Sequence, residues 1–356
     1  MNNAIKLLDK LFKTKTLDIE EYEHLISAQS EETAQYAKKL ADELRRDYYS
    51  NEIFVRGLIE IGNVCKNDCF YCGIRKSNKN CDRYILSKEQ ILNCCKEGYA
   101  LGFRTFVLQG GENVISVNNI CEIVKNIKSL YPDCAVTLSL GEYEKEDYIK
   151  MFESGADRYL LRHETADKEH YEKLHPKEMS FENRMQCLKN LKEIGFAVGC
   201  GFMVGSPYQT AKTLAKDLKF IEEFSPDMCG IGPFIPHKST PFKDFKAGDL
   251  HQTLYLLSLI RIIKPNILLP ATTALGTISP KGREMGIEAG ANVVMPNLSP
   301  VTVRKKYELY NNKICTGEES AQCKECLNSR MKSVGFEIIE DRGDLRKERK
   351  LKNGNL

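Results

Sequence analysis

The stretch "FVRGLIEIGNVCKNDCFYCGIR", residues 54–75, joins an apolar run typical of a buried β-strand to three closely spaced cysteines. Cys65, Cys69 and Cys72 stand at a C-x3-C-x2-C spacing. Three thiols in so short a stretch are suited to hold zinc or an iron–sulfur cluster, and the spacing alone does not separate the two. Because the cysteines follow the strand directly, we expect them at the carboxyl end of a sheet.

Seven more strand-like runs follow along the chain, and amphipathic segments separate them. Segments such as 116–131 and 180–195 carry apolar residues at intervals of three and four, which indicates helices that pack on a sheet. The alternation over about 250 residues predicts an α/β fold, specifically a full (βα)8 TIM-type barrel, with a doubly wound open sheet as the alternative. The seven runs are residues 105–110, 135–141, 158–164, 197–205, 228–235, 268–276 and 293–297.

The chain divides by sequence character into three parts. Residues 1–50 predict N-terminal helices outside the barrel, and Ser30 followed by two glutamates is typical of a helix start. Residues 51–300 predict the barrel itself. Residues 301–356 predict a C-terminal helix, a second cysteine group and a charged tail. We expect the charged end, from residue 340, to be frayed and solvated, with a docking element as the alternative.

Charge and cysteine content restrict the partners and the compartment. The 52 basic and 49 acidic residues are interspersed and leave a net charge of +3, so we expect a small-molecule substrate and neither nucleic acid nor membrane as a partner. No apolar run is long enough to span a membrane, and the first residues lack a secretory signal, so the predicted location is cytoplasmic. In this reducing compartment scattered cysteines are expected to be small buried hydrophobes. These are Cys81, Cys94, Cys95, Cys121, Cys134, Cys187, Cys200 and Cys229.

A fourth ligand is the feature that separates zinc from a cluster. A structural zinc site needs a Cys or His in a second knuckle, and no C-x2-C pair follows the first group within the usual ~12 to 20 residues. A 4Fe–4S cluster held by only three cysteines leaves one iron open to a further ligand. On a barrel the group would lie at the C-terminal face, where the active sites of this fold are built. We therefore favour a cluster with an open iron.

Polar residues at later strand ends add candidates for the same site. Residues 109–112, "QGGE", follow the second strand and offer an amide side chain, two glycine amides and a carboxylate. Arg162, His163 and Glu164 end the fourth strand in succession, which is unfavourable unless they are paired or used, and a structural ion pair on the rim is the alternative. Arg184 lies on the next helix, where its planar guanidinium is suited to bind a carboxylate; a solvated arginine is the alternative.

The last strand ends carry weaker candidates, each of which is also compatible with an ordinary core or capping role. They are Thr272 and Thr273 after the seventh strand, Met295 after the eighth, Tyr307 and Tyr310 on one face of the following helix, and His237 in a proline-rich loop after the sixth.

The "CFYC" end of the cysteine group, with an aromatic residue before the last cysteine, resembles the motif of the radical S-adenosylmethionine (SAM) enzymes. The resemblance implies that Cys65, Cys69 and Cys72 hold a 4Fe–4S cluster whose open iron chelates the amino and carboxylate groups of SAM. It further implies that an electron from the cluster cleaves SAM to methionine and a 5′-deoxyadenosyl radical. The cofactor would then supply the chemistry, and the barrel would position the cofactor and exclude water from the site.

Further strings narrow the resemblance to one family. "RYLLRHETAD", "FENR", "GIGPFIPH", "PATTALGT" and "GANVVMPN" are similar to HydE, the radical SAM maturase family of FeFe-hydrogenase, over about residues 5–340. The resemblance implies an organometallic substrate, an iron–cysteine dicarbonyl cyanide precursor of the di-iron subcluster. It implies as partners the HydG and HydF maturases and a reductant such as ferredoxin or flavodoxin. The residues it assigns to cofactor binding are Gln109, Gly110, Gly111, Glu112, Ser139, Glu164 and Arg184, and those at the reaction are Arg162, Thr272, Thr273, Met295 and Tyr307.

Three alternatives to this function differ in what they need from the chain. Biotin synthase holds its sulfur-donating cluster with cysteines at inner strand positions, which we align with Leu108, Thr137 and Gly199, and none of these can bind iron. A methylornithine synthase would use a similar barrel. A non-enzymatic iron–sulfur scaffold or electron carrier would need the cysteines but not Glu164 and Arg184.

A second cysteine group, "ICTGEESAQCKEC", places Cys315, Cys323 and Cys326 at a C-x7-C-x2-C spacing after the last strand. Its residues are compatible with a zinc knuckle, with reduced surface thiols or with an iron–sulfur site. The family resemblance favours a second cluster, 2Fe–2S or 4Fe–4S. We expect this group near the surface, too far from the first cluster to share its substrate, and therefore accessory.

Overall fold

The computed structural model describes residues 3–316 and 324–347. The strands are β1 (Glu52–Val55), β2 (Gly57–Gly62), β3 (Thr105–Gly110), β4 (Ala135–Ser139), β5 (Arg158–Leu160), β6 (Ala197–Cys200), β7 (Met203–Val204), β8 (Met228–Cys229), β9 (Gly232–Pro233), β10 (Val293–Val294) and β11 (Glu337–Ile339). The helices are α1 (Asn3–Thr14), α2 (Ile19–Ser27), α3 (Glu31–Tyr49), α4 (Lys88–Ala100), α5 (Val117–Leu130), α6 (Lys145–Glu153), α7 (Lys168–Leu174), α8 (Phe181–Ile194), α9 (Ala211–Phe224), α10 (Leu250–Ile263), α11 (Thr273–Ile278), α12 (Gly282–Glu288), α13 (Val301–Arg304) and α14 (Lys324–Lys332).

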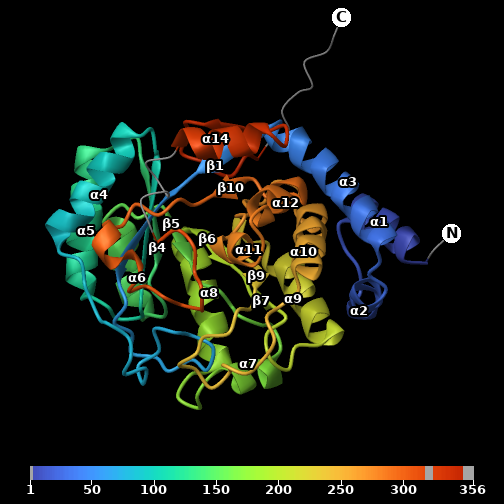
Figure 1. Cartoon of the computed structure of the whole chain (residues 1–356), viewed down its shortest axis with the longest axis horizontal. Helices are drawn as coiled ribbons and strands as arrows, with labels where there is room; N and C mark the ends of the chain where they lie inside the picture. Colours follow the sequence, from blue (N-terminus) through green and yellow to red (C-terminus); the bar gives the residue numbers. More distant parts are fainter. Residues whose placement is uncertain (1–2, 317–323, 348–356) are drawn as a thin grey trace, which may run out of the picture.

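The strands form a parallel, barrel-like sheet with helices around it (Figure 1). Six strands pair in the order β2-β3-β4-β5-β6-β8. Isolated bridges continue the pairing from Met228 to Leu268 and from Pro270 to Val293. β10 then pairs with β1, and a further bridge joins Leu58 of β2 to Asn297. The predicted α/β, TIM-type fold is confirmed, although single bridges rather than full ladders join its last third.

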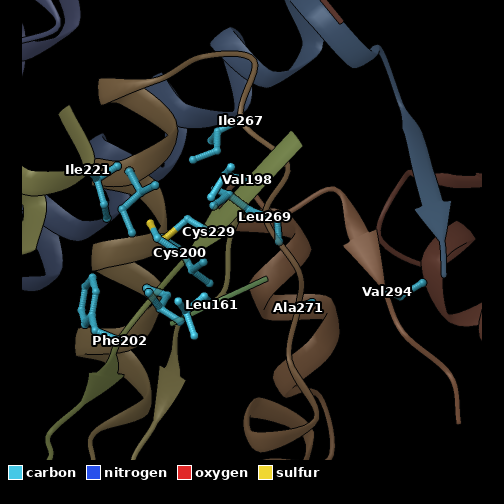
Figure 2. Packing of buried hydrophobic residues seen from close by; sticks show 14 of the residues in the cluster. Leu161, Val198, Cys200, Phe202, Ile221, Cys229, Ile267, Leu269, Ala271 and Val294 are labelled. Atoms are coloured by element: carbon cyan, nitrogen blue, oxygen red, sulfur yellow. The ribbon is translucent and has the colours of Figure 1, made fainter. Parts of the chain in front are cut away.

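Hydrophobic packing between strands and helices fixes the barrel. In a strand, alternate residues face opposite sides, so the outward residues of each strand meet the covering helices. Figure 2 shows this layer at β6 and β8, where Val198, Cys200 and Cys229 pack against Ile221 of α9. The helices begin at side-chain caps, as where Ser180 accepts a hydrogen bond from the backbone N–H of Asn183.

The N-terminal helices lie outside the barrel, as we expected. α3 packs on α10, and α2 packs on α9 (Figure 1). Ser30 caps α3 by accepting a hydrogen bond from the backbone N–H of Thr33. The boundaries drawn at residues 50 and 300 stay a prediction. No helix among residues 3–316 and 324–347 is both long and apolar enough to cross a membrane.

Residues 340–347 differ from the frayed tail that the charge predicted from residue 340 onward, and the rest of that predicted tail, residues 348–356, lies outside the described residues. β11 pairs in parallel with β1, and residues 342–346 cover the amino-terminal end of the strands. There Arg158, which is 1% exposed, donates to Thr105 Oγ1 at 3.0 Å and to the Asp344 carboxylate at 2.5 Å. Because buried arginines need polar partners, the charged residues from Arg342 to Arg346 dock instead of fraying.

Several predicted strands are shorter than their apolar runs. The run at 197–205 breaks at Gly201 into β6 and β7, because Gly201 has a φ of +153° and the backbone of Gly230, just after β8, leaves no room for a Cβ there. The run at 268–276 forms only bridges before α11 begins at Thr273. Six of the eight scattered cysteines are buried as predicted, whereas Cys81 and Cys121 are only partly buried.

Candidate active site

One cavity of about 330 Å³ opens at the carboxyl ends of the strands. Every residue predicted for the cluster, for SAM and for the reaction lines it. These are Cys65, Cys69, Cys72, Gln109, Gly110, Gly111, Glu112, Ser139, Arg162, Glu164, Arg184, Thr272, Thr273, Met295 and Tyr307. The fold thus brings residues from almost every βα unit to one place, and their individual roles stay predictions.

The cysteine loop is held by two arginines that the motif does not include. Arg75 pairs with Asp68 at 2.5 Å across the loop. Arg83 donates to the carbonyl oxygens of Ile74 at 2.7 Å and of Arg75 at 2.6 Å. A loop lacks the regular backbone hydrogen bonds of a sheet. Here the two arginines form hydrogen bonds within the loop instead, and these order the backbone that carries the three thiols.

The three thiols of the cysteine loop are partly exposed and line the same cavity. Burial raises the pKa of the Cys65 and Cys69 thiols and raises that of Cys72 to about 12, so the isolated thiols would stay protonated. A bound cationic centre would reverse this preference. Within residues 3–316 and 324–347, no three Cys, His, Asp or Glu side chains converge to hold one metal ion. Three thiols that line one cavity are a donor set that suits an iron–sulfur cluster.

The glycine turn after β3 packs directly against the cysteine loop. A Cβ on Gly111 would lie 2.8 Å from Cys65 Cβ and closer still to the Val64 carbonyl oxygen, so only glycine fits. The backbone N–H of Glu112 donates to Cys65 Sγ at 3.4 Å. The Glu112 side chain is 6% exposed and pairs with Lys66 at 2.9 Å. The "QGGE" turn therefore supports the cysteine loop as well as lining the cavity.

Arg162 and Glu164 bring buried polar atoms to the cavity without satisfying them. Arg162 Nη2 and Glu164 Oε2 lie 3.1 Å apart, yet neither is aligned for a hydrogen bond, and Arg162 Nε is also unpaired. The contact is weak despite the short distance, because alignment decides the strength of a hydrogen bond. Glu164 has a φ of +63°, an unusual conformation for a residue with a side chain. Unpaired buried polar groups of this kind are typical of a site that binds a polar ligand.

Arg184 is positioned by a residue that the sequence analysis missed. Its Nε pairs with the Glu142 carboxylate, and its Nη1 donates to the Arg162 carbonyl oxygen at 2.6 Å. The arginine is 6% exposed, so Glu142 offsets the desolvation of its charge. Glu142 stands directly after the β4 strand end, and that position was the available signal for it.

The cavity wall contains a second buried ion pair that the sequence analysis also missed. Lys313 Nζ pairs with the Glu60 carboxylate, which is 1% exposed and also accepts from Asn297 Nδ2 at 2.9 Å. Lys313 also donates to the Tyr307 carbonyl oxygen at 2.9 Å. Gln109 Nε2 donates to the Tyr307 hydroxyl at 3.4 Å. Glu60 gave no signal, because it lies inside an otherwise apolar strand.

The aromatic residue of the cysteine motif is fixed by a histidine. Tyr71 OH and His175 Nε2 lie 3.1 Å apart, and His175 Nδ1 lies 2.9 Å from the Tyr171 carbonyl oxygen. Nδ1 must carry the proton to bond a carbonyl, so Tyr71 donates to Nε2. Burial lowers the pKa of His175 to about 3, which keeps the ring neutral.

Of the other candidates, Tyr310 also lines the cavity, whereas His237 does not. His237 is 3% exposed, and its Nδ1 accepts from the backbone N–H of Ser239 at 3.1 Å, a local structural contact. Leu108 packs in the outer core whereas Gln109 lines the cavity, so the inner positions of β3 are Gln109 and Val107. Our alignment of Leu108 to an inner position was therefore wrong, although the corrected positions also lack a thiol.

The second cysteine group is only partly described. Cys315 has a φ of +66°, and its Sγ accepts from Arg283 Nη2 at 2.9 Å. Cys326, near the start of α14, is exposed and disulfide-bonded, so its thiol would have to be reduced before it could bind iron. Cys323 lies outside the described residues. The second cluster stays a prediction.

Comparisons with known proteins agree with this geometry. Residues 59–221 match the family model described as "Radical SAM superfamily". The chain is 47% identical over 306 residues to the [FeFe] hydrogenase maturase subunit HydE of Thermotoga maritima, covering 86% of this chain and 87% of that protein. It is 29% identical to the 3-methylornithine synthase of Methanosarcina acetivorans, covering 80% of this chain and 81% of that one. The crystal structure of methylornithine synthase (PylB) has the same fold, with a TM-score of 0.78 and 24% identity, covering 94% of this chain and 97% of that one.

Proposed function

The chain belongs to the HydE family of radical SAM enzymes, and we propose from that premise a specific reaction for it. The enzyme cleaves SAM to a 5′-deoxyadenosyl radical that acts on an iron–cysteine dicarbonyl cyanide precursor of the di-iron subcluster of FeFe-hydrogenase. One observation carries the proposal: three thiols, a paired arginine and unpaired polar atoms share the same cavity.

In this proposal Cys65, Cys69 and Cys72 hold the 4Fe–4S cluster. When bound, the cluster and SAM together supply the electron and the adenosyl radical. The chain itself contributes the ordered cysteine loop, braced by Arg75 and Arg83. The backbone N–H of Glu112 donates to Cys65 Sγ and stabilises the thiolate that ligation requires.

SAM is bound by residues on the same side of the cavity. We assign Arg184 to the methionine carboxylate, because two of its donors are already fixed by Glu142 and by the Arg162 carbonyl, which orients the guanidinium. We assign Glu164 to the ribose hydroxyls, because its Oε2 is buried without a hydrogen bond. Gly110, Gly111, Glu112 and Ser139 complete this part of the wall.

We assign the organometallic substrate to other residues of the same cavity wall. Arg162 and Thr272 present unpaired polar atoms, Nε, Nη2 and Oγ1, that suit a ligand with acceptor groups such as cyanide, carbonyl and carboxylate. Gln109, Thr273, Met295 and Tyr307 line the remaining surface. The buried Glu60–Lys313 pair neutralises itself, which leaves the Arg162 charge to attract an anionic substrate.

The proposal includes partners and a compartment. The precursor would come from HydG and the product would pass to HydF, while ferredoxin or flavodoxin supplies electrons. The free thiols among the described residues require a reducing compartment, and we therefore place the reaction in the cytoplasm. The second cysteine group, Cys315, Cys323 and Cys326, would hold an accessory cluster in the reduced protein.

The test is SAM turnover by anaerobically reconstituted protein. We expect 5′-deoxyadenosine to form in the presence of reductant, and faster with the iron–cysteine dicarbonyl cyanide complex. Lysine is the matched substrate control, because it is an isomer of methylornithine and the 29% identical relative is named 3-methylornithine synthase. Acceleration by lysine instead of the iron complex, with methylornithine as product, would replace the proposed substrate by that of the related enzyme.

A further inference from the structure

His163 stands between Arg162 and Glu164 in the sequence but takes no part in the cavity wall. Its side chain is fully buried and points the other way, between the rings of Phe202 and Phe220, whose centroids lie 5.7 Å and 4.7 Å from that of His163. Phe202 belongs to the outer hydrophobic layer shown in Figure 2. A histidine in such an apolar layer is unfavourable unless both ring nitrogens have partners.

Both nitrogens of His163 do have partners, and these fix its protonation. Nδ1 accepts a hydrogen bond from the backbone N–H of Gly201 at 3.2 Å, so Nδ1 is unprotonated. Nε2 therefore carries the proton and donates it to Asp217 Oδ1 at 3.3 Å. Asp217 is fully buried on α9, and the same Oδ1 accepts from the backbone N–H of Ala166 at 2.5 Å.

These bonds enclose the backbone of Glu164 on both sides. On the N-terminal side of Glu164, the His163 ring accepts a hydrogen bond from the backbone of Gly201. On its C-terminal side, the backbone of Ala166 donates a hydrogen bond to Asp217. The N–H of Glu164 itself donates to the Gly201 carbonyl oxygen at 3.0 Å. Glu164 has the left-handed φ of +63°, which a residue with a side chain adopts only where its surroundings over-determine it. The hydrogen bonds of His163 and Asp217 restrain the backbone at this position.

We infer that His163 and Asp217 are positioning residues that hold Glu164 in the left-handed conformation, so that its carboxylate faces the cavity. The inference rests on the proposed function, in which Glu164 binds the SAM ribose. Without the two bonds, the backbone at Glu164 would relax toward ordinary φ values and turn the carboxylate away. Neither residue touches the ligand in this scheme.

Conservative variants separate the two hydrogen bonds. In His163→Asn, the amide oxygen replaces Nδ1 as acceptor for Gly201 but does not reach Asp217. In Asp217→Asn, one oxygen remains to accept from both Ala166 and His163, whereas Asp217→Ala loses both bonds. Burial raises the pKa of Asp217, so the charge itself is not favoured there and asparagine should be tolerated. Phe220→Leu is the matched control, because it loosens the packing on His163 without removing a hydrogen bond.

The experiment measures SAM affinity of the reconstituted holoprotein by titration of its EPR signal, in the wild-type and Glu164→Ala backgrounds. We expect Asp217→Ala to weaken SAM binding about 10-fold, the effect of one lost hydrogen bond, and Asp217→Asn and Phe220→Leu to change it less than about 3-fold. His163→Asn should lie between them. In the Glu164→Ala background, Asp217→Ala should have no further effect on SAM affinity. A change that acted independently of Glu164 would instead weaken SAM binding further in that background.

Two outcomes would count against different claims. If Glu164→Ala weakens SAM binding but Asp217→Ala does not, the positioning role is wrong and the proposed SAM site stands. If Glu164→Ala leaves SAM binding unchanged, the assignment of Glu164 itself fails. If Asp217→Ala weakened SAM binding equally in both backgrounds, or if Phe220→Leu weakened it as much as Asp217→Ala, then His163 and Asp217 would contribute only to packing. Thermal unfolding of each variant shows whether it is folded at the assay temperature.

Discussion

Arg184→Ala tests the assignment of the SAM carboxylate and yields two separable effects. The first is on affinity: a charge-assisted hydrogen bond contributes about 1.5 to 3 kcal/mol, so its loss should weaken SAM binding roughly 10- to 150-fold. The second is on stability, because the change removes Arg184 from the Glu142 carboxylate, 11% exposed at its side chain, which then keeps the hydrogen bond from Asn183 Nδ2 at 2.6 Å but no ion pair. Breaking a buried pair from one side costs about 3 to 5 kcal/mol, and this should lower the thermal midpoint.

Glu142→Gln distinguishes the two effects. It removes the ion pair but leaves the arginine, whose Nη1 still donates to the Arg162 carbonyl oxygen at 2.6 Å. We expect Glu142→Gln to lower the thermal midpoint as well, yet to change SAM affinity less than about 10-fold. Affinity is measured by EPR-monitored titration of the reconstituted holoprotein, and stability by thermal unfolding. SAM affinity unaltered in Arg184→Ala, with the cluster intact, would refute the assignment and return Arg184 to a structural role.

The remaining predictions address the clusters and the barrel floor. Cys65→Ser, Cys69→Ser and Cys72→Ser should each remove the SAM-sensitive EPR signal, and a signal that persists and shifts with SAM in the triple variant would contradict the ligand set. Gly111→Ala should abolish cluster incorporation, because the added Cβ would clash with Val64 and Cys65. Gly230→Ala is the control and should incorporate a normal cluster, because the atom nearest to its added Cβ lies 3.9 Å away. Equal iron contents in the two variants would show that the turn can move to accommodate the Cβ. The combined change Cys315→Ser, Cys323→Ser and Cys326→Ser should lower iron per chain yet leave SAM cleavage and hydrogenase maturation intact, and full iron content would eliminate the second cluster. Asp344→Ala should lower stability by about 1 to 3 kcal/mol, because Arg158 loses a partner while buried; an unchanged unfolding midpoint would mean that solvent replaces the carboxylate.

The sequence alone determined the fold class and many of the polar residues of the cavity wall. Strand periodicity is local, and in parallel α/β sheets the carboxyl ends of all strands meet on one face. Polar residues that follow strands, such as Gln109, Arg162 and Thr272, could therefore be assigned to one site before any distance was known. The cysteine spacing indicates a metal or cluster site within eight residues, from Cys65 to Cys72, and the lack of a second C-x2-C pair nearby favours the cluster without tertiary information.

The tertiary structure decided which residues hold that wall in place. The partner of Arg184 is Glu142, and the restraint on Glu164 comes from Gly201 and, through His163, from Asp217 on α9. Such contacts join segments far apart in the chain, and no local period encodes them. The same holds at the barrel floor, where a charged tail that looked solvated docks because Arg158 is buried and needs polar partners. Burial is a property of the whole fold, so the residues that satisfy buried charge are found only in three dimensions.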